Sequence, residues 1–300
     1  MRRNMSNTGV TVLTNELVKD MALPRPETGH KGTFGTALIT AGSEFMTGAA
    51  VLSCGAALRS GAGLVRVYSE GKTLDAIRTN HPCALLSLRD GMPSSVLRTA
   101  TRLLEKADAV LIGPGIPSDD LNILPLLELF IREAKNLVID AGALSAAAHD
   151  KEHILPLLRH RPTPAILTPH MGEFARISAG VDGISPDDTS EVSAMKLSAK
   201  LKSVIVLKNN KTVIAMPDGK MYVNDASNSG LAKGGSGDVL AGLMTGLLAQ
   251  GIAPEKAACA AVKIHSDAGL AAAEEYGVRS MLPSDLESFF PEAFERSGWS

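Results

Sequence analysis

The chain has 300 residues, of which 45% are hydrophobic and 4% aromatic, and its formal net charge is −2 at pH 7. This near-neutral charge excludes the basic surface of a typical nucleic-acid-binding protein, and no run approaches the ~18 apolar residues of a membrane span. The N-terminus has no apolar signal-peptide segment, and the three cysteines, Cys54, Cys83 and Cys259, are scattered without a CxxC pair. We therefore expect a soluble cytoplasmic protein with reduced thiols.

The first half of the chain alternates short apolar runs with helical patterns. Residues 1–30 are polar and are expected to form a loose lead-in with one short helix near 15–21. A strand at 36–41, an Ala-rich helix at 48–60 and a strand at 64–68 follow, and this order is the building block of a parallel sheet. The alternation continues with predicted strands at 84–88, 109–112, 137–140 and 165–168 and predicted helices at 95–106 and 121–134.

The second half adds a hairpin to this pattern. Residues 212–216 and 220–223 flank the turn sequence Pro217-Asp218-Gly219 and are expected to pair as a β-hairpin. The chain shows no linker or repeat, so we predict one α/β domain over residues 1–300, with a mostly parallel central sheet flanked by helices. The other predicted elements are a helix from Ser185-Pro186 to about Leu201, a strand at 204–207, and helices at 254–275 and 286–294.

The stretch from Asn224 to Gly251 holds the strongest functional signal. The run GGSGD at 234–238 leads into apolar residues at three- and four-residue spacing, so a helix is predicted to start near Asp238. A glycine-rich loop at a helix N-terminus forms an anion site, because the first N–H groups lack internal partners and the dipole end is positive. Gly242 and Gly246 lie four residues apart on this helix, where another element is expected to approach closely.

A carboxylate is unusual in an anion site, which leaves two interpretations of Asp238. It is either the N-cap of the helix, since Asp is favoured there, or a general base that deprotonates a hydroxyl attacking a phosphoryl group. Spacing alone modestly favours the cap. The loop is not a Walker loop, because Lys233 precedes the glycines instead of following them.

Further candidate residues follow predicted strands, at the sheet edge where open α/β folds bind ligands. The glycines within 42–48 form either a ligand loop or only a tight turn. Asp140 either contacts Mg²⁺ through water or a ligand, or caps the next helix. His170 is either functional or a cap, and the lysines within 208–212 either bind phosphate or belong to an exposed turn. For the last three, position alone favours the structural interpretation.

His149 and His153 lie four residues apart, a spacing that can bind zinc on a helix. The intervening Glu152 is not in the H-E-x-x-H position, and the flanking residues are charged. A solvated helix face is the favoured interpretation, and no residue is assigned to a metal.

The ordered motifs resemble those of one enzyme family. GGSGD followed by VLAGLMTGLLAQG resembles the ribokinase-like superfamily. The stretches HKGTFGTALITAGS from His30, LIGPG from Leu111, ILTPHMGEFARI from Ile166 and VIVLKNNKTVIA from Val204 resemble the ADP- or ATP-dependent NAD(P)H-hydrate dehydratases within it. The set is specific, although each motif alone is weak. It implies a ribokinase-like fold, in which parallel units precede a hairpin and an anion-hole helix.

The resemblance also implies an activity and a set of site residues. The activity is ADP-dependent dehydration of the S-epimer of hydrated NADH or NADPH, with Mg²⁺ and with ADP or ATP as co-substrate, by a homo-oligomer that is often tetrameric. The catalytic base is then Asp238. The hydrate-binding residues are Ala49, Gly115, His170 and Asp238, the nucleotide-binding residues are Lys208, Asn209, Asn210, Lys211, Thr212 and Gly237, and the anion hole consists of the N–H groups of Gly235, Ser236 and Gly237.

The chain departs from the family pattern at three places. The usual Asp-Ala-Asp ends in Gly142, the usual Pro after Thr-Pro-His is Met171, and the loop entry N-x-T-G-N carries Ala226 and Ser227 instead of Thr and Gly. Two other functions stay open: a ribokinase-like ATP-dependent kinase of a small vitamin-precursor alcohol, which would use the same base, and a catalytically silent nucleotide-binding protein. The family also occurs fused to an epimerase domain, for which the N-terminal part of this chain is expected to be too short.

Overall fold

A computed structural model describes residues 9–185 and 187–299, which form ten strands and twelve α-helices. The strands are β1 (Val10–Val12), β2 (Thr36–Thr40), β3 (Leu64–Ser69), β4 (Leu85–Leu88), β5 (Ala109–Ile112), β6 (Leu137–Ile139), β7 (Ile166–Leu167), β8 (Val204–Leu207), β9 (Thr212–Ala215) and β10 (Met221–Asn224). The helices are α1 (Asn15–Lys19), α2 (Thr47–Arg59), α3 (Gly71–Asn80), α4 (Pro93–Leu104), α5 (Leu124–Glu133), α6 (Ala141–His149), α7 (Lys151–Leu158), α8 (Met171–Ser178), α9 (Ser190–Leu201), α10 (Ser236–Ala249), α11 (Pro254–Ser280) and α12 (Leu286–Arg296).

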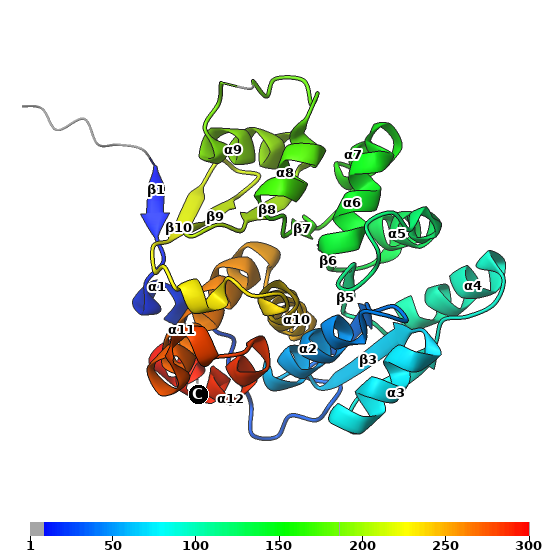
Figure 1. Ribbon diagram of the computed structural model, residues 1–300, viewed down its shortest axis with the longest axis horizontal. Coiled ribbons are helices and arrows are strands. Elements are labelled where there is room, and N and C mark those ends of the chain that lie inside the picture. Colours follow the sequence, from blue (N-terminus) through cyan, green and yellow to red (C-terminus); the bar gives the residue numbers. More distant parts are fainter. Residues whose placement is uncertain (1–8, 186, 300) are drawn as a thin grey trace, which may run out of the picture.

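The ten strands form one sheet in the order β1-β10-β9-β8-β7-β6-β5-β2-β3-β4 (Figure 1). Neighbouring strands are parallel except where β9 pairs with β8 and with β10. Parallel strands are normally covered on both faces, because the crossover helices lie there. The predicted fold class, a mostly parallel sheet flanked by helices with a hairpin before the anion-hole helix, is confirmed.

The central strands are apolar on both sides. In β2, Ile39 belongs to the hydrophobic cluster shared with α2, α10 and α11, whereas its neighbour Leu38 belongs to the cluster shared with α4 to α9. Successive side chains of a strand point to opposite faces, so one strand contributes to two cores. Figure 1 shows the two helix layers, with α10 and α11 on one side of the sheet and α5 to α9 on the other.

Helices α2 and α10 pack closely because α10 presents glycines to its neighbour. A Cβ atom at Gly242 would lie 2.2 Å from the carbonyl oxygen of Ser53, and one at Gly246 would lie 1.9 Å from Ser60 Oγ. No side chain fits at either distance. The expected close approach to this helix face is confirmed, and it brings the N-terminal ends of α2 and α10 together at the carboxyl edge of the sheet.

The N-terminal segment is part of the sheet, contrary to the expected loose lead-in. Strand β1 pairs in parallel with β10, and Val18 in α1 is fully buried. Trp299 Nε1 donates a hydrogen bond to the Val18 carbonyl oxygen at 2.9 Å. The side chains of β1 are themselves exposed. An edge strand of this kind carries no apolar signal in the sequence.

Two helices also differ from the prediction. Helix α3 was not predicted, because its mostly polar sequence buries only three side chains. Helix α9 begins at Ser190 with Thr189 as its N-cap, later than the predicted start near 185; Pro186 lies outside the described residues. The other predicted elements are present within a few residues of their predicted ends.

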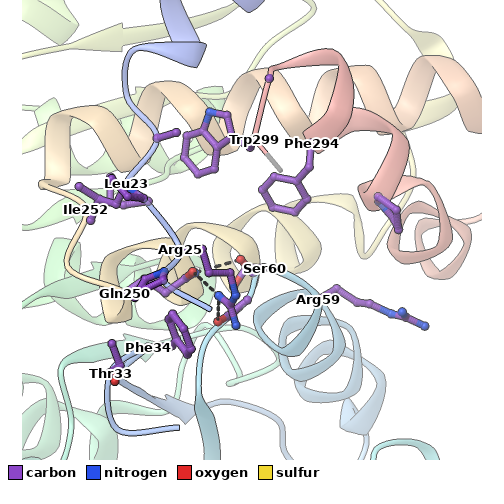
Figure 2. Close-up of a pocket in the computed structure, with 16 residues that line it drawn as sticks. Leu23, Arg25, Thr33, Phe34, Arg59, Ser60, Gln250, Ile252, Phe294 and Trp299 are labelled. Atoms are coloured by element: carbon purple, nitrogen blue, oxygen red, sulfur yellow. Dashed lines mark hydrogen bonds between the residues drawn. The ribbon is translucent and has the colours of Figure 1, made fainter. Parts of the chain in front are cut away.

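Two of the cavities among the described residues lie at opposite edges of the sheet. One, of about 370 Å³, opens where the carboxyl ends of β8 and β10 meet the start of α10. The other, of about 600 Å³, opens at the amino edge, beside the C-terminal ends of α2 and α10 (Figure 2).

Among the described helices, none combines the length and the apolar character that crossing a bilayer requires.

Candidate active site

Helix α10 begins at the carboxyl edge with open backbone N–H groups. Gly235, which precedes the helix, has a φ of 107°, a left-handed conformation that favours glycine. No side chain caps the helix. Within residues 9–185 and 187–299, the N–H groups of Gly235, Gly237 and Asp238 have no hydrogen-bond acceptor, whereas that of Ser236 donates to the Lys233 carbonyl oxygen at 3.3 Å. Free N–H groups at the positive end of a helix can bind an anion.

Asp238 lies in the first turn of α10 and is not its N-cap, which is Gly235. The capping interpretation of Asp238 is therefore wrong. Burial, together with the negative charges of Asp140 and Glu173, raises the pKa of Asp238 to about 7, while Lys208 acts against this rise. A carboxyl group with a pKa near neutrality can both hold and release a proton at physiological pH.

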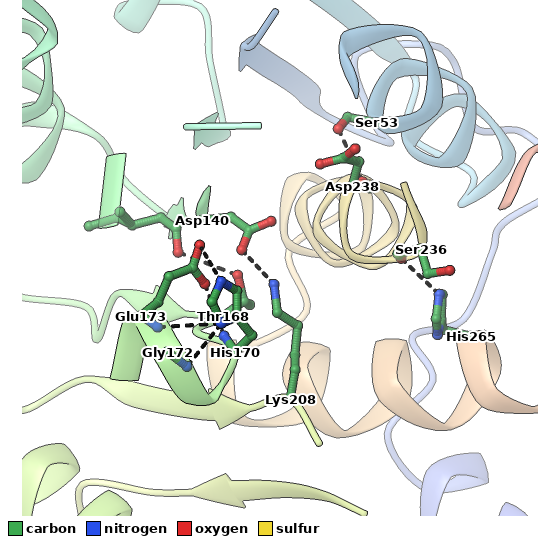
Figure 3. A network of polar contacts seen from close by, with 11 residues as sticks. Ser53, Asp140, Thr168, His170, Gly172, Glu173, Lys208, Ser236, Asp238 and His265 are labelled. Atoms are coloured by element: carbon green, nitrogen blue, oxygen red, sulfur yellow. Dashed lines mark hydrogen bonds and ion pairs between the residues drawn. The ribbon is translucent and has the colours of Figure 1, made fainter. Parts of the chain in front are cut away.

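A buried ion pair joins the ends of β6 and β8 (Figure 3). Asp140 Oδ1 and Lys208 Nζ are 2.7 Å apart, and their side chains are 2% and 22% exposed. Asp140 occupies the N-cap position of α6, but its side chain makes no capping hydrogen bond, so the expected capping role is wrong. A Cβ atom at Gly237 would lie 3.2 Å from Lys208 Nζ. The ammonium group therefore lies beside the first turn of α10, and Lys208 is not part of an exposed turn.

His170 caps helix α8 and also remains accessible. Its Nδ1 accepts hydrogen bonds from the N–H groups of Gly172 at 3.0 Å and Glu173 at 3.4 Å, and Glu173 Oε2 accepts one from the His170 N–H at 2.9 Å. This reciprocal arrangement is a capping box. Because Nδ1 is an acceptor, Nε2 carries the proton. The side chain is 56% exposed and a backbone bridge pairs His170 with Lys208, so the imidazole can meet a ligand beside the ion pair.

Ala49 and Gly115 lie on the other side of the first turn of α10. Gly115 has a φ of 66°, and a Cβ atom there would lie 2.8 Å from Ala49 Cβ. Ser53 Oγ donates to the carbonyl oxygens of Ala49 at 2.9 Å and Asp238 at 3.0 Å. The structure thus brings the predicted hydrate-binding residues Ala49 and Gly115 beside the predicted base. The glycine loop at 42–48 closes on them, since the Gly42 N–H donates to the Pro114 carbonyl oxygen at 2.7 Å.

The cavity of about 370 Å³ collects most of the predicted nucleotide-binding residues. Lys208, Asn209, Asn210, Thr212 and Gly237 line it, together with Ser236 of the predicted anion hole. Lys211 does not line it, because its side chain is exposed and pairs with Asp225. The opposite wall is formed by residues that sequence reasoning did not assign: Asn224, Ala226, Asn228, Leu231, Ala232, Leu240, Val262, His265 and Ser266. Ala226, one of the departures from the family pattern, is therefore in contact with this space.

His265 in α11 is the most notable residue that the sequence did not indicate. Its Nε2 lies 3.0 Å from the Ser236 carbonyl oxygen in the first turn of α10. Burial lowers the pKa of His265 to about 4, so the ring is neutral and donates through Nε2. The imidazole holds the start of the anion-hole helix against α11. A single His within an Ala-rich helix gives no sequence signal for this role.

Among the described residues, no three His, Cys, Asp or Glu side chains are grouped to hold a metal ion. His149 ends α6 and His153 lies in α7, beyond a break at Asp150, so they do not share one helix. Mg²⁺ is commonly held by one or two carboxylates together with substrate phosphates. The negative charge of Asp140 is close enough to raise the pKa of Asp238. These two carboxylates are therefore suited to a Mg²⁺ ion that binds together with a nucleotide.

The sequence profile of the NAD(P)H-hydrate dehydratases matches residues 37–292. The chain belongs to this family. The matched region includes every predicted site residue, from Ala49 to Asp238, and every residue that lines the cavity at the carboxyl edge.

Curated dehydratase relatives are of two lengths. The ADP-dependent (S)-NAD(P)H-hydrate dehydratase of Bacillus subtilis is 34% identical over 283 residues, covering 94% of this chain and 97% of that protein. The bifunctional NAD(P)H-hydrate repair enzyme of Moorella thermoacetica is 38% identical over 276 residues, covering 90% of this chain and 51% of that protein. The chain thus spans about half the length of its bifunctional relatives and nearly all of the single-function one.

Solved structures of dehydratases share the fold. The ADP/ATP-dependent NAD(P)H-hydrate dehydratase of Bacillus subtilis, co-crystallised with ATP and Mg²⁺, aligns with a TM-score of 0.82 at 32% identity, over 97% of this chain and 99% of that one. A ribokinase-like superfamily protein of Enterococcus faecalis aligns with a TM-score of 0.85 at 26% identity, over 100% of both chains. The fold is therefore ribokinase-like, as the motif order implied.

Proposed function

We propose that the protein is an ADP-dependent dehydratase of the S-epimers of hydrated NADH and NADPH, which repairs these cofactors in the cytoplasm. The hydrate carries a hydroxyl on its nicotinamide ring, and hydroxide is a poor leaving group. In the proposed reaction the hydroxyl oxygen attacks the terminal phosphorus of ADP, and AMP leaves. The lone pair of the ring nitrogen then expels phosphate, and loss of a proton from the adjacent ring carbon restores the dihydronicotinamide. One nucleotide is consumed per hydrate.

The observation that carries this proposal is the state of Asp238. A general base is most effective when its pKa lies near the working pH, and burial raises the pKa of Asp238 to about 7. In the proposed reaction its ionised form takes the proton of the hydrate hydroxyl as that oxygen attacks. A protein that only bound nucleotides would have no use for a buried carboxylate among the N–H groups of an anion site.

The groups around Asp238 support phosphoryl transfer. The N–H groups of Gly235 and Gly237 are free to stabilise charge on the transferred phosphoryl group. Lys208 Nζ, held 2.7 Å from Asp140 Oδ1, is placed to contact the phosphates. Asp140 keeps this ammonium group in position and offers a carboxylate to Mg²⁺, which would neutralise phosphate charge when bound with the nucleotide.

The two substrates would occupy different sides of the first turn of α10. The cavity lined by Asn209, Asn210 and Thr212 suits the nucleotide. The side of Ala49 and Gly115, together with the exposed imidazole of His170, would receive the hydrated nicotinamide. Asp238 lies between them, where the hydroxyl and the terminal phosphate must meet. Lys211, which pairs with Asp225 outside the cavity, would lie at the rim of the proposed nucleotide site.

Two further features of the protein are proposed from its family. We expect one domain over residues 1–300, which the single ten-stranded sheet supports. We also expect a homo-oligomer, by resemblance a tetramer. Sedimentation equilibrium of the purified protein would give the number of subunits.

The reaction is tested by its products. Purified protein is incubated with Mg²⁺, ADP and chemically hydrated NADH. We expect recovery of the near-ultraviolet absorbance of the dihydronicotinamide, with one AMP and one phosphate formed per NADH. An alcohol kinase of the same fold would leave the phosphate on its substrate. Inactivity with both ADP and ATP, alongside phosphorylation of a pyrimidine or thiazole alcohol, would overturn the proposal.

A further inference from the structure

The larger cavity, of about 600 Å³, lies away from the catalytic residues (Figure 2). Its walls come from the segment 22–34, the turn that follows α2, the end of α10, and the C-terminal residues of the chain. Helix α10 has 14 residues, which at 1.5 Å per residue separate this cavity from the first turn by roughly 20 Å. A ligand bound here would therefore not touch Asp238, and nothing in the proposed reaction uses this space.

Arg25 provides a fixed positive group in this cavity. Its Cζ lies 3.7 Å from the centre of the Phe34 ring, in a cation–π contact. Its Nη1 donates hydrogen bonds to the Gly61 carbonyl oxygen at 3.0 Å and to Gln250 Oε1 at 3.3 Å. Nε and Nη2 of Arg25 have no acceptor in the described part of the chain. One nitrogen thus anchors the guanidinium, and the others remain available to an anion.

The carbonyl groups around Arg25 are already paired. Helix C-termini carry negative partial charge and normally disfavour an anion. Here Gln250 Nε2 donates to the carbonyl oxygens of Ser60 and Gly246, both at 2.9 Å. Arg25 Nη1 donates to the carbonyl oxygen of Gly61. Among the described residues that line the cavity, two are arginines, Arg25 and Arg59, and none is acidic. The positive charge therefore remains the dominant electrostatic feature of the cavity.

The wall across from Arg25 is aromatic. The rings of Phe294 and Trp299 lie 5.8 Å apart between centres, at an angle of 34°. Figure 2 shows both rings on one side of the cavity and Arg25 on the other. Trp299 is held in place by its hydrogen bond to the Val18 carbonyl oxygen at 2.9 Å. Glu295 lines the adjoining hollow on the outer side of Trp299, which discourages an anion there and leaves the Arg25 side as the place for negative charge.

We propose that this cavity is a second ligand site, for a small planar aromatic molecule that carries one anionic group. The ring of the ligand packs against Trp299 and Phe294, and its carboxylate pairs with the free nitrogens of Arg25. Arg59, at the rim, adds a weaker, solvent-screened attraction. The cavity volume of about 600 Å³ is within the usual range for small-molecule sites, roughly 300 to 1,000 Å³.

Binding can be tested without knowing the natural ligand, because Trp299 is the only tryptophan of the chain. The probes are 4-nitrobenzoate, its neutral analogue 4-nitrobenzamide, and the non-aromatic cyclohexanecarboxylate. Quenching of Trp299 emission, corrected with free N-acetyltryptophanamide, reports occupancy next to this ring, and equilibrium dialysis gives the dissociation constant. We expect 4-nitrobenzoate to bind with a Kd in the range of about 0.1 to 1 mM. Both analogues should bind about tenfold more weakly or worse, because each lacks one of the two required features.

Variants locate the site. Arg25→Gln should weaken 4-nitrobenzoate binding about tenfold, and Arg59→Gln about two- to threefold. The matched control is Arg102→Gln, which removes an exposed arginine from α4, outside the cavity lining, and should leave the Kd unchanged. Circular dichroism and melting temperature confirm that each variant is folded. Saturating Mg²⁺ and ADP should leave the Kd of 4-nitrobenzoate unchanged, since the two cavities lie at opposite ends of α10.

The possible results separate cleanly. The proposal is supported if the aromatic carboxylate binds selectively and quenches Trp299 emission. This binding must also be lost in Arg25→Gln and persist in the presence of ADP. Equal binding of 4-nitrobenzoate and 4-nitrobenzamide would overturn it even if Arg25→Gln fails to fold, because that comparison uses only the unaltered protein. Displacement by ADP, or no binding at several millimolar, would overturn it as well.

Discussion

The two ends of helix α10 are built in opposite ways. At the C-terminal end, Gln250 pairs with the carbonyl oxygens of Ser60 and Gly246, and Arg25 pairs with Gln250. At the N-terminal end, no side chain caps the helix. Ser236 Oγ is buried there without a hydrogen-bond partner among the described residues, and the pKa of Asp238 is raised to about 7.

This difference separates groups that stabilise the fold from groups that are kept for a ligand. Buried polar groups without partners cost free energy, and natural proteins tolerate that cost mainly at functional sites. The paired end of α10 lowers the free energy of the folded chain by itself. In the proposed function, the unpaired end would be completed by a ligand with negative charge. Changes at the first end should therefore alter stability, and changes at the second should alter activity.

The largest effect on activity is expected for Asp238→Asn. Because Asn cannot accept the proton of the hydrate hydroxyl, kcat should fall by about 10³-fold or more. The variant should fold and should still bind ADP, since the N–H groups and Lys208 are unchanged. Single-turnover kinetics and ADP titration calorimetry check both parts. Retention of most of the activity would remove Asp238 from the role of base.

The same variant should change how stability depends on pH. The pKa of Asp238 rises from 3.8 to about 7 on folding, so the folded chain holds this proton more tightly than the unfolded chain between these values. The contribution of Asp238 to stability is then fully present below about pH 4 and is lost as the pH rises through 7. Asp238→Asn should therefore raise the melting temperature at pH 8 relative to the unaltered protein, with little difference at pH 4. A lower melting temperature at pH 8 would contradict this expectation.

Opposite shifts in the pH profile are expected for the two members of the buried ion pair. Lys208 lowers the pKa of Asp238 and Asp140 raises it. The rise of kcat/KM with pH, which reports the free enzyme, should therefore move to higher pH in Lys208→Met and to lower pH in Asp140→Asn. Lys208→Met should also lower kcat/KM by about 10- to 100-fold, because a contact to the phosphates is lost. Lys220→Met, which removes an exposed lysine from the hairpin turn, is the control, and shifts of the same sign would refute the assignment.

A smaller, selective effect is expected for His170. His170→Ala should raise KM for the hydrate more than KM for ADP, because in the proposed reaction the exposed imidazole contacts the hydrate. The change also removes the cap of α8, which should cost about 1 kcal/mol of stability. His170→Asn keeps a capping acceptor but lacks the imidazole, so it should restore the melting temperature without restoring KM. Steady-state kinetics with each substrate varied would decide, and equal changes in both KM values would exclude His170 from the hydrate site.

The smallest effect on activity is expected at the paired end of α10. Gln250→Ala removes two hydrogen bonds to carbonyl oxygens and should lower the free energy of unfolding by about 1 to 2 kcal/mol. Both kcat and KM should stay unchanged, because the first turn of α10 is far from the substitution. Urea unfolding and the dehydratase assay measure the two effects. A large loss of activity with intact stability would mean that the two ends do not act separately.

The sequence by itself determined the order of most elements, though not β1 or α3, and it predicted a candidate site at the loops that follow the strands. Apolar runs without alternation predicted buried parallel strands, because each central strand packs on both faces. The small residues of GGSGD predicted an anion site, since a glycine-rich turn lets a ligand approach the open N–H groups of the first helical turn. Gly242 and Gly246 predicted a close helix contact, because two glycines four residues apart leave one face of a helix without side chains.

The tertiary structure alone decided which polar groups meet. Asp140 and Lys208 are separated by 68 positions, and no local pattern couples an aspartate after one strand to a lysine after another. The cap interpretation of Asp238 depended on where α10 begins, and the two-residue difference between prediction and structure excluded it. His265 and Arg25 act through groups on other elements, and Trp299 reaches α1 from the far end of the chain. Pairings of this kind arise from packing across the fold, so they have no signature in the residues on either side of them.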